Sequence, residues 1–304
     1  MLHYSPADHR NFSVLSTTMP VSPTVTRFAP SPTGLLHCGH AFSALTAFRI
    51  AQKEGGRFLL RIEDIDSTRC QRRFEEALKE DLAWLGITWE SPVRRQSDHL
   101  AEYKEVAEKL RARGLLYPCF CTRRDIQREI EAAGGAPHGS EGPLYPGTCR
   151  RLSSRDVEER MARGDEYALR LNLEEALSAA GSGLEWFDRH RGLQKARPEL
   201  LGDTVLVRKD IGCSYHLCVV WDDALQGVNL ISRGEDLFEA THLHCLLQAV
   251  LGLPCPEYVH HELLRDSSGR RLAKRDQAET LRSLRERGVQ PEELCRTLGV
   301  PPVF

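Results

Sequence analysis

The fold is decided by the stretch Arg27-Phe28-Ala29-Pro30-Ser31-Pro32-Thr33-Gly34-Leu35-Leu36-His37-Cys38-Gly39-His40. It begins in a predicted strand over residues 24–29, crosses a loop rich in breakers, and enters a predicted helix over residues 39–53. A second predicted strand over residues 57–63 follows, and then an amphipathic helix whose apolar stripe is Phe74, Leu78, Leu82 and Leu85. Strand, helix, strand and helix within about 60 residues favour an α/β fold of the Rossmann type, with a doubly wound parallel sheet.

The composition is that of a folded globular chain. Of 304 residues, 41% are hydrophobic and 28% are charged, and 41 Lys and Arg against 43 Asp and Glu give a net charge of −2. These values exclude a disordered polyelectrolyte, a collagen-like chain and the overall basic balance of many nucleic-acid-binding proteins. They do not exclude a local basic face, because the net charge does not report how the charged side chains are distributed over the surface.

No membrane or export segment is predicted. No run approaches the roughly 18 apolar residues of a membrane span. Residues 1–23 lack the basic start and apolar run of a secretory signal. We expect residues 1–23 to form a disordered leader, with Met1 or Met19 as the true start. We also expect a cytoplasmic protein that is a monomer.

Ten cysteines in a cytoplasmic chain are expected to be thiols, so a cluster of them favours a metal over disulfides. Cys119, Cys121 and Cys149 fall in a segment that is rich in Pro and Gly and poor in apolar residues. Three thiolates suit tetrahedral zinc, which would supply folding energy to this segment. The fourth ligand stays open between Tyr145 and His138. The alternative to a zinc site is three unpaired buried thiols.

The segment His37-Cys38-Gly39-His40 marks the entry into the first predicted helix. Backbone N–H groups and the helix dipole at such a start suit a phosphate, and Gly39 lets a nucleotide approach closely. Two histidines three residues apart can donate to negative charge that develops on a phosphate. The alternative is two ordinary loop histidines.

Four blocks of the sequence resemble, in the same order, the signature blocks of class I glutamyl-tRNA synthetases. They span residues 24–290 and consist of the opening stretch 27–40, Arg61-Ile62-Glu63-Asp64-Ile65-Asp66-Ser67-Thr68-Arg69, the pair Trp221-Asp222-Asp223 with Ile231-Ser232-Arg233-Gly234-Glu235-Asp236-Leu237, and Arg271-Leu272-Ala273-Lys274-Arg275. The last block departs from the family, because Arg271 and Ala273 stand where lysine and serine are common.

The resemblance implies a role for particular side chains. Arg27 and Arg233 would pair with the carboxylates of glutamate and Glu63 with its ammonium group, while Tyr215 and Ser31 would complete the pocket. A further set would act on ATP: His37, Gly39, His40 and Lys274. Taken singly, each arginine could instead be a solvated surface charge, and Lys274 could belong to an ordinary basic loop.

The length points to a shorter paralogous family, the glutamyl-queuosine tRNA(Asp) synthetases. The resemblance implies activation of L-glutamate with ATP and Mg²⁺, followed by transfer to the cyclopentenediol of queuosine in the anticodon of tRNA(Asp). The spacing Cys119, Cys121, Tyr145 and Cys149 is similar to the zinc site of this family. We expect activation without tRNA, because the chain stops at Phe304. The alternatives are a truncated glutamyl-tRNA synthetase that charges a tRNA 3′ end and an inactive tRNA-binding module.

The expected domain organisation has three parts after the leader. Residues 24–116 and 200–265 form the catalytic core, and residues 117–199 form the zinc-bearing, acceptor-binding-like insert. Residues 266–304 hold the lysine signature loop and a short helical region that would contact a tRNA stem.

Overall fold

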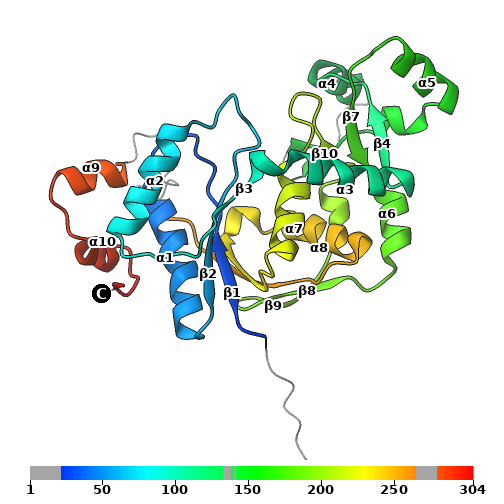
Figure 1. Ribbon diagram of the computed structural model, residues 1–304. Coiled ribbons are helices and arrows are strands. Elements are labelled where there is room, and N and C mark those ends of the chain that lie inside the picture. Colours follow the sequence, from blue (N-terminus) through cyan, green and yellow to red (C-terminus); the bar gives the residue numbers. More distant parts are fainter. Residues whose placement is uncertain (1–21, 133–137, 140–141, 265–278, 304) are drawn as a thin grey trace, which may run out of the picture.

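The computed structural model of the chain describes residues 22–132, 138–139, 142–264 and 279–303. Most of the predicted leader lies outside the described residues, and so does the segment 265–278 with Arg271, Ala273 and Lys274. The remainder forms a layered α/β body from which a smaller lobe projects (Figure 1).

Three parallel strands form the first half of the body. β1 (Val25–Phe28) pairs with β2 (Arg57–Ile62), and β2 pairs with β3 (Arg94–Arg95). The connections between them contain α1 (Cys38–Lys53) and α2 (Arg72–Trp84). This confirms the predicted strand and helix order. The apolar residues at helical spacing in α1 are buried: Ala41, Ala44, Leu45, Phe48 and Ala51.

The second half is a mixed sheet in the order β11 (Leu230–Gly234), β12 (Glu257–His261), β8 (Glu185–Asp188) and β9 (Gly192–Lys195). β11, β12 and β8 are parallel, and only β9 is antiparallel. The Asn229 N–H donates to the Val25 carbonyl at 3.2 Å, which places β11 beside β1. The helices α7 (Tyr215–Leu225) and α8 (Ala240–Leu251) cover this half.

The projecting lobe contains a separate antiparallel sheet. Its strand order is β10 (Val205–Val207), β7 (Ala168–Leu171) and β4 (Leu116–Cys119). Two short strands pair nearby, β5 (His138–Gly139) and β6 (Gly142–Pro143). The helices of this region are α4 (Arg123–Ala132) and α5 (Ser154–Ala162), with the 3₁₀ turn η2 (Thr148–Arg151). α6 (Leu173–Ala180) and the 3₁₀ turn η3 (Pro198–Leu200) instead contact α8 of the body.

The sheets cross the expected boundaries of the insert. β8 and β9 fall within residues 117–199, yet β8 pairs with β12 of the body. β10 falls after residue 200, yet it pairs with β7 of the lobe. The chain therefore enters the lobe, returns to the body, and contributes one more strand to the lobe before α7. Alternation along a short strand predicts the strand but not its partner, which explains the difference.

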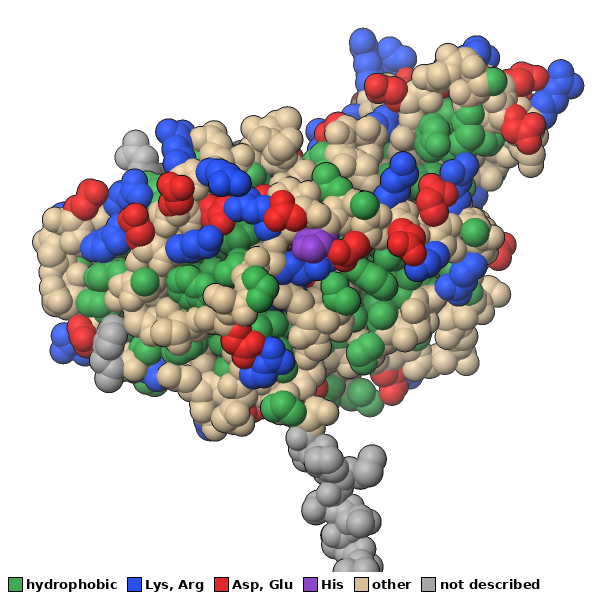
Figure 2. Space-filling view, viewed as in Figure 1, with side chains coloured by type: hydrophobic (Ala, Val, Ile, Leu, Met, Phe, Trp, Pro, Cys, Tyr) green, Lys and Arg blue, Asp and Glu red, His purple; other side chains and the backbone are tan. Residues whose placement is uncertain are grey.

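The C-terminal region is helical, as predicted. α9 (Leu281–Glu286) and α10 (Pro291–Thr297) pack beside α1 and α2, and Leu281, Leu284 and Leu294 join the same apolar core as α1. The remaining helices of the body are η1 (Gln96–His99), α3 (Leu100–Ala112) and η4 (Glu235–Leu237). Among the described helices, none is both long and apolar enough to cross a membrane. Basic and acidic side chains are interspersed on the face shown in Figure 2.

Candidate active site and metal centre

Two histidines form the start of α1. The N–H of Gly39 donates to Nδ1 of His37 at 3.1 Å, and the N–H of His37 donates to Nδ1 of His40 at 3.2 Å. Because Nδ1 accepts in both rings, Nε2 carries the proton in each neutral ring. The ring centroids lie 3.9 Å apart. The reciprocal cap therefore sets two Nε2–H donors together at a helix N-terminus, which suits a phosphate.

Gly39 is needed for this cap. A Cβ at that position would lie 3.0 Å from Cε1 and 3.1 Å from Nδ1 of His37. Such contacts are tighter than ordinary van der Waals contact, so a side chain would displace the His37 ring. Besides the predicted close approach of a nucleotide, the position of the His37 ring therefore also favours glycine at residue 39.

The residues on both sides of segment 265–278 lie at the start of α1. Before the segment, Nε2 of His261 lies 2.7 Å from Oγ of Ser43. After it, Thr280 forms a β-bridge with His37, and the Leu281 N–H donates to the Leu36 carbonyl at 2.8 Å. The described residues on either side of the segment that holds Lys274 therefore lie beside the proposed phosphate site.

A cavity of 470 Å³ opens beside the start of α1, at the carboxyl ends of β1 and β11. Ligands of open α/β sheets collect at this edge. The lining includes the residues expected to bind glutamate, together with one histidine of the α1 cap: Arg27, Ser31, His40, Glu63, Tyr215 and Arg233. Residues that are far apart in the sequence thus surround one space, with His37 and Gly39 at the adjoining helix start.

Arg27 is held by a carboxylate of the chain. Its Nε and Nη2 donate to the two oxygens of Asp223 at 3.0 and 3.3 Å. Asp223 also accepts from Nη1 of Arg61 at 2.7 Å, and Nη2 of Arg61 donates to Glu63 at 3.0 Å. The sequence predicts a fork for substrate at Arg27, but two of its N–H groups are directed at Asp223.

Glu63 is a buried carboxylate at the wall of the cavity. Burial raises its pKa, while the positive charges of Arg61 and Arg27 act in the opposite direction. An ammonium group in the cavity would add a further charge that favours the carboxylate form. The position is therefore suited to the role predicted for it.

Arg233 differs from Arg27 in its partners. Its Nε donates to Nε2 of His260 at 3.1 Å, its Nη1 lies 3.2 Å from Nδ1 of His244, and its Nη2 donates to Oγ1 of Thr241 at 2.5 Å. The guanidinium carbon lies 5.1 Å from the centre of the Tyr258 ring. Among the described residues, Arg233 makes no ion pair with a carboxylate, although it is buried.

Several buried polar residues that had no predicted role support the site. Asp222 accepts from Tyr103 Oη at 2.8 Å, from Arg94 Nε at 2.8 Å and from Gln96 Nε2 at 2.9 Å. Arg61 has no exposed surface and interrupts the otherwise apolar buried part of β2, which follows the exposed Arg57. A charged residue inside a buried strand requires a partner, so the sequence alone indicates a buried partner for Arg61.

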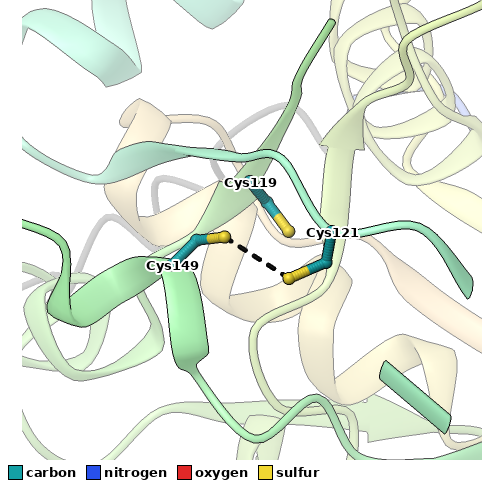
Figure 3. Close-up of side chains that lie close together, drawn as sticks. All are labelled: Cys119, Cys121 and Cys149. Carbon is teal, nitrogen blue, oxygen red and sulfur yellow. Dashed lines mark hydrogen bonds between the residues drawn. The ribbon is translucent and has the colours of Figure 1, made fainter. Parts of the chain in front are cut away.

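Three of the predicted metal ligands meet in the lobe. Their Sγ atoms, from Cys119, Cys121 and Cys149, lie within 4.8 Å of one another, with 3.4 Å between those of Cys121 and Cys149. Figure 3 shows the sulfur atoms directed toward one another. Cys119 ends β4, and Cys149 comes from η2. These three cysteines could hold a metal ion.

Tyr145 is the fourth member of this group. Its Oη lies 3.4 Å from Sγ of Cys119 and 3.5 Å from Sγ of Cys121, and it accepts the N–H of Cys149 at 2.9 Å. The Arg170 guanidinium lies 3.9 Å from the centre of the Tyr145 ring. The side chain of His138, the alternative ligand, lies outside the described part of the structure. Among the described side chains, the geometry favours Tyr145.

One of the thiols is predisposed to ionise. A hydrogen bond from Cys119 lowers the pKa of Cys149 to about 6, while the same contact, with burial, raises the pKa of Cys119 to about 12. Thiolates are the form that binds metal, and a cation among three sulfur atoms would favour ionisation of the others. The donor set is soft and compact, as a thiophilic metal requires.

Known proteins match most of this chain. A family described as "tRNA synthetases class I (E and Q), catalytic domain" matches residues 23–301. A curated glutamyl-Q tRNA(Asp) synthetase of Rhodobacter capsulatus is 50% identical over 91% of this chain and 100% of the relative. Another, from Nocardia farcinica, is 42% identical over 91% of this chain and 85% of the relative.

A solved structure extends the comparison to the fold. The glutamate tRNA ligase of Elizabethkingia meningosepticum, crystallised with its amino acid, matches with a TM-score of 0.69 and 29% identity. The match covers 83% of this chain and 52% of that chain, so this chain spans about half the length of that structure.

Proposed function

Because this chain belongs to the class I tRNA synthetases (E and Q), we propose that it activates glutamate with ATP and transfers it to queuosine in the anticodon of tRNA(Asp). Relatives that are named glutamyl-Q tRNA(Asp) synthetase support the choice of substrates. The structural observation that carries the proposal is Arg233, a buried guanidinium with neutral partners at the wall of the cavity. A buried cation of this kind calls for an anionic ligand.

Glutamate occupies the cavity in this proposal. Arg233 pairs with a carboxylate of glutamate and Glu63 with its ammonium group, while Ser31 and Tyr215 line the pocket. Arg27 contributes the N–H groups that neither Asp223 nor the Ser232 carbonyl accepts. An arginine fork matches a carboxylate in geometry as well as in charge, so the substrate is both bound and oriented.

Activation joins the α-carboxylate of glutamate to the α-phosphorus of ATP. A carboxylate oxygen attacks this phosphorus, the bond to the β-phosphate oxygen breaks, and the products are glutamyl-adenylate and pyrophosphate. His37 and His40 hold phosphate oxygens through Nε2–H, and Lys274 balances the charge on pyrophosphate. Mg²⁺ accompanies ATP, and we assign no residue of the chain to it.

Transfer follows from the mixed anhydride. A hydroxyl of the cyclopentenediol attacks the activated carbonyl carbon, an ester forms, and AMP leaves. Orientation of the two reactants supplies much of the rate in such a step. Charging of a tRNA 3′ end would use the same chemistry on a different hydroxyl, so the position of the ester on tRNA separates the two activities.

Activation is expected to proceed without tRNA. The residues proposed to bind glutamate are already held by contacts within the chain, as Arg233 is by His260, so tRNA is not needed to order them. Pyrophosphate exchange with glutamate and ATP alone measures this step. The Lys274→Ala variant should slow exchange by at least about 10²-fold, as for loss of one transition-state charge contact. Exchange that starts only when tRNA is added would contradict the prediction.

We also propose that the metal of the lobe is zinc and that its role is structural. The Cys119→Ser variant should bind less zinc and unfold the lobe at a lower temperature, while retaining part of the exchange activity. Zinc content by mass spectrometry under native conditions checks this. Cys255→Ser is the matched control, because Cys255 is exposed and lies outside the cluster. One equivalent of zinc in a Cys119, Cys121 and Cys149 triple serine variant would rule out the site.

A further inference from the structure

Among the described residues, every side chain that forms a hydrogen bond with Arg233 is neutral, so its charge faces the cavity without a carboxylate partner from that part of the chain. His260, His244 and Thr241 take three of its N–H groups. Arg27, across the same cavity, is instead paired with both oxygens of Asp223. Two buried arginines thus line one cavity, and only one of them has a carboxylate counter-ion within the described residues.

Hydrogen bonds fix the tautomer of each histidine. Nε2 of His260 accepts from Arg233, so the proton lies on Nδ1, which donates to Asp188 Oδ2 at 2.7 Å. Nδ1 of His244 accepts from Arg233, so the proton lies on Nε2, which lies 3.1 Å from Nδ1 of His216. Each ring is therefore an acceptor toward Arg233 and a donor on its far side.

Both rings are held in the neutral form. Burial, with the charge of Arg233, lowers the pKa of His260 to about 4. The same two causes hold the pKa of His244 well below its ordinary value. Asp188 acts through the ring of His260, since that imidazole stands between its carboxylate and the guanidinium.

We propose that His244, and His260 oriented by Asp188, are positioning residues that hold Arg233 through neutral acceptors and so determine selectivity for glutamate over glutamine. Carboxylate acceptors would position the guanidinium equally well, but they would cancel the charge that distinguishes a substrate carboxylate from a carboxamide. This inference rests on the proposed function, because it takes the ligand of Arg233 to be the side-chain carboxylate of glutamate, the group that glutamine lacks.

The first test compares two variants of one size. In His244→Gln the amide oxygen can still accept from Arg233, whereas His244→Glu adds a negative charge at the same place. Pyrophosphate exchange should give a KM for glutamate at least about tenfold higher in His244→Glu than in His244→Gln, because like charges then face each other. The ratio of exchange with glutamate to exchange with glutamine should fall in His244→Glu alone. The KM for ATP should be the same in both.

The second test reverses the tautomer of His260. Oδ1 of Asp188 accepts two backbone N–H groups, those of His190 and Arg191 at 2.9 and 3.0 Å, whereas Oδ2 accepts one, that of His260 at 3.2 Å. The oxygen of an asparagine is therefore favoured on the Oδ1 side. In Asp188→Asn the amide N–H then faces Nδ1 of His260, so Nδ1 must accept and the ring proton moves to Nε2. The Nε2–H of His260 then faces the Nε–H of Arg233, and two donors meet where a hydrogen bond had been. Loss of this charged hydrogen bond should raise the KM for glutamate roughly 10- to 100-fold, with ATP unaffected.

The outcomes distinguish failure of the proposed function from failure of this inference. If the wild-type protein performs no glutamate-dependent exchange, the proposed function fails and this inference fails with it. The wild-type protein could instead be active while His244→Gln and His244→Glu have the same KM for glutamate and the same ratio of exchange with glutamate to exchange with glutamine. That result overturns this inference alone. An unchanged KM for glutamate in Asp188→Asn overturns the part assigned to Asp188 and His260.

Discussion

The Arg233→Ala variant is expected to require far more glutamate for pyrophosphate exchange than the wild-type protein. Removing one partner of a buried charge pair costs about 2–5 kcal/mol, or roughly 30- to several-thousand-fold in affinity. The cost arises because the glutamate carboxylate would be left in a buried pocket without its counter-ion. The KM for ATP should change little, since ATP is assigned to the start of α1. Initial rates at varied glutamate and fixed, saturating ATP measure the effect.

Arg191→Ala provides the matched control for this experiment. Arg191 lies between β8 and β9 with its side chain 43% exposed, and it lies 3.4 Å from Glu235. A solvated pair of this kind contributes little, so the control should keep the wild-type KM for glutamate. A wild-type KM in Arg233→Ala, or an equal increase in both variants, would show that Arg233 is not the carboxylate receptor.

The Asp223→Asn variant is expected to lose about 3 kcal/mol or more of its free energy of unfolding. Asp223 is the shared acceptor of Arg27 and Arg61, and both arginines are buried. An asparagine carries no charge and its amide nitrogen cannot accept a hydrogen bond, so both buried guanidinium groups lose a charged partner. Denaturant unfolding followed by circular dichroism measures the difference from the wild-type protein.

The pH dependence gives this prediction a defined sign. Burial alone would raise the pKa of Asp223, but the charges of Arg27 and Arg61 hold it below its ordinary value of 3.8. A depressed pKa means that the stabilisation is present above about pH 4 and is lost as the pH falls through the folded-state pKa. The difference in stability between wild-type and Asp223→Asn should therefore shrink in acid.

Glu90→Gln is the control for stability. Glu90 forms an ion pair with Arg57 at 2.5 Å, with the two side chains 43% and 50% exposed, respectively. Exposed pairs contribute about 0–1 kcal/mol, so this variant should be nearly as stable as the wild-type protein. Equal losses in Asp223→Asn and Glu90→Gln would mean that the buried network has no special role.

Local patterns predicted the first half of the fold well. The helix expected over residues 39–53 runs from Cys38 to Lys53, and the strand expected over residues 57–63 runs from Arg57 to Ile62. Helical periodicity and breakers act over a few residues, so one sequence contains the necessary information. The boundary between the lobe and the body was harder to predict, because strands such as β8 find their partners far along the chain.

The charged network around Asp223 also depends on long-range partners that local patterns do not predict. Arg61 stands out in an apolar strand, which indicates a buried partner, but Asp223 lies 162 residues away. The family blocks brought Arg27, Glu63 and Arg233 into the candidate site without stating what holds each one. Only the structure shows that Arg27 faces a carboxylate and that Arg233 faces imidazoles. This difference in partners, rather than residue type, makes the two arginines chemically unlike.

The position of the ester on tRNA tests the central claim most directly. The full-length protein is incubated with ATP, labelled glutamate and tRNA(Asp) that either contains or lacks queuosine, and nuclease fragments are then separated to locate the label. The account predicts label on the anticodon fragment of the queuosine-containing tRNA and none on tRNA that lacks queuosine. Label on the 3′-terminal adenosine of both tRNAs would contradict it.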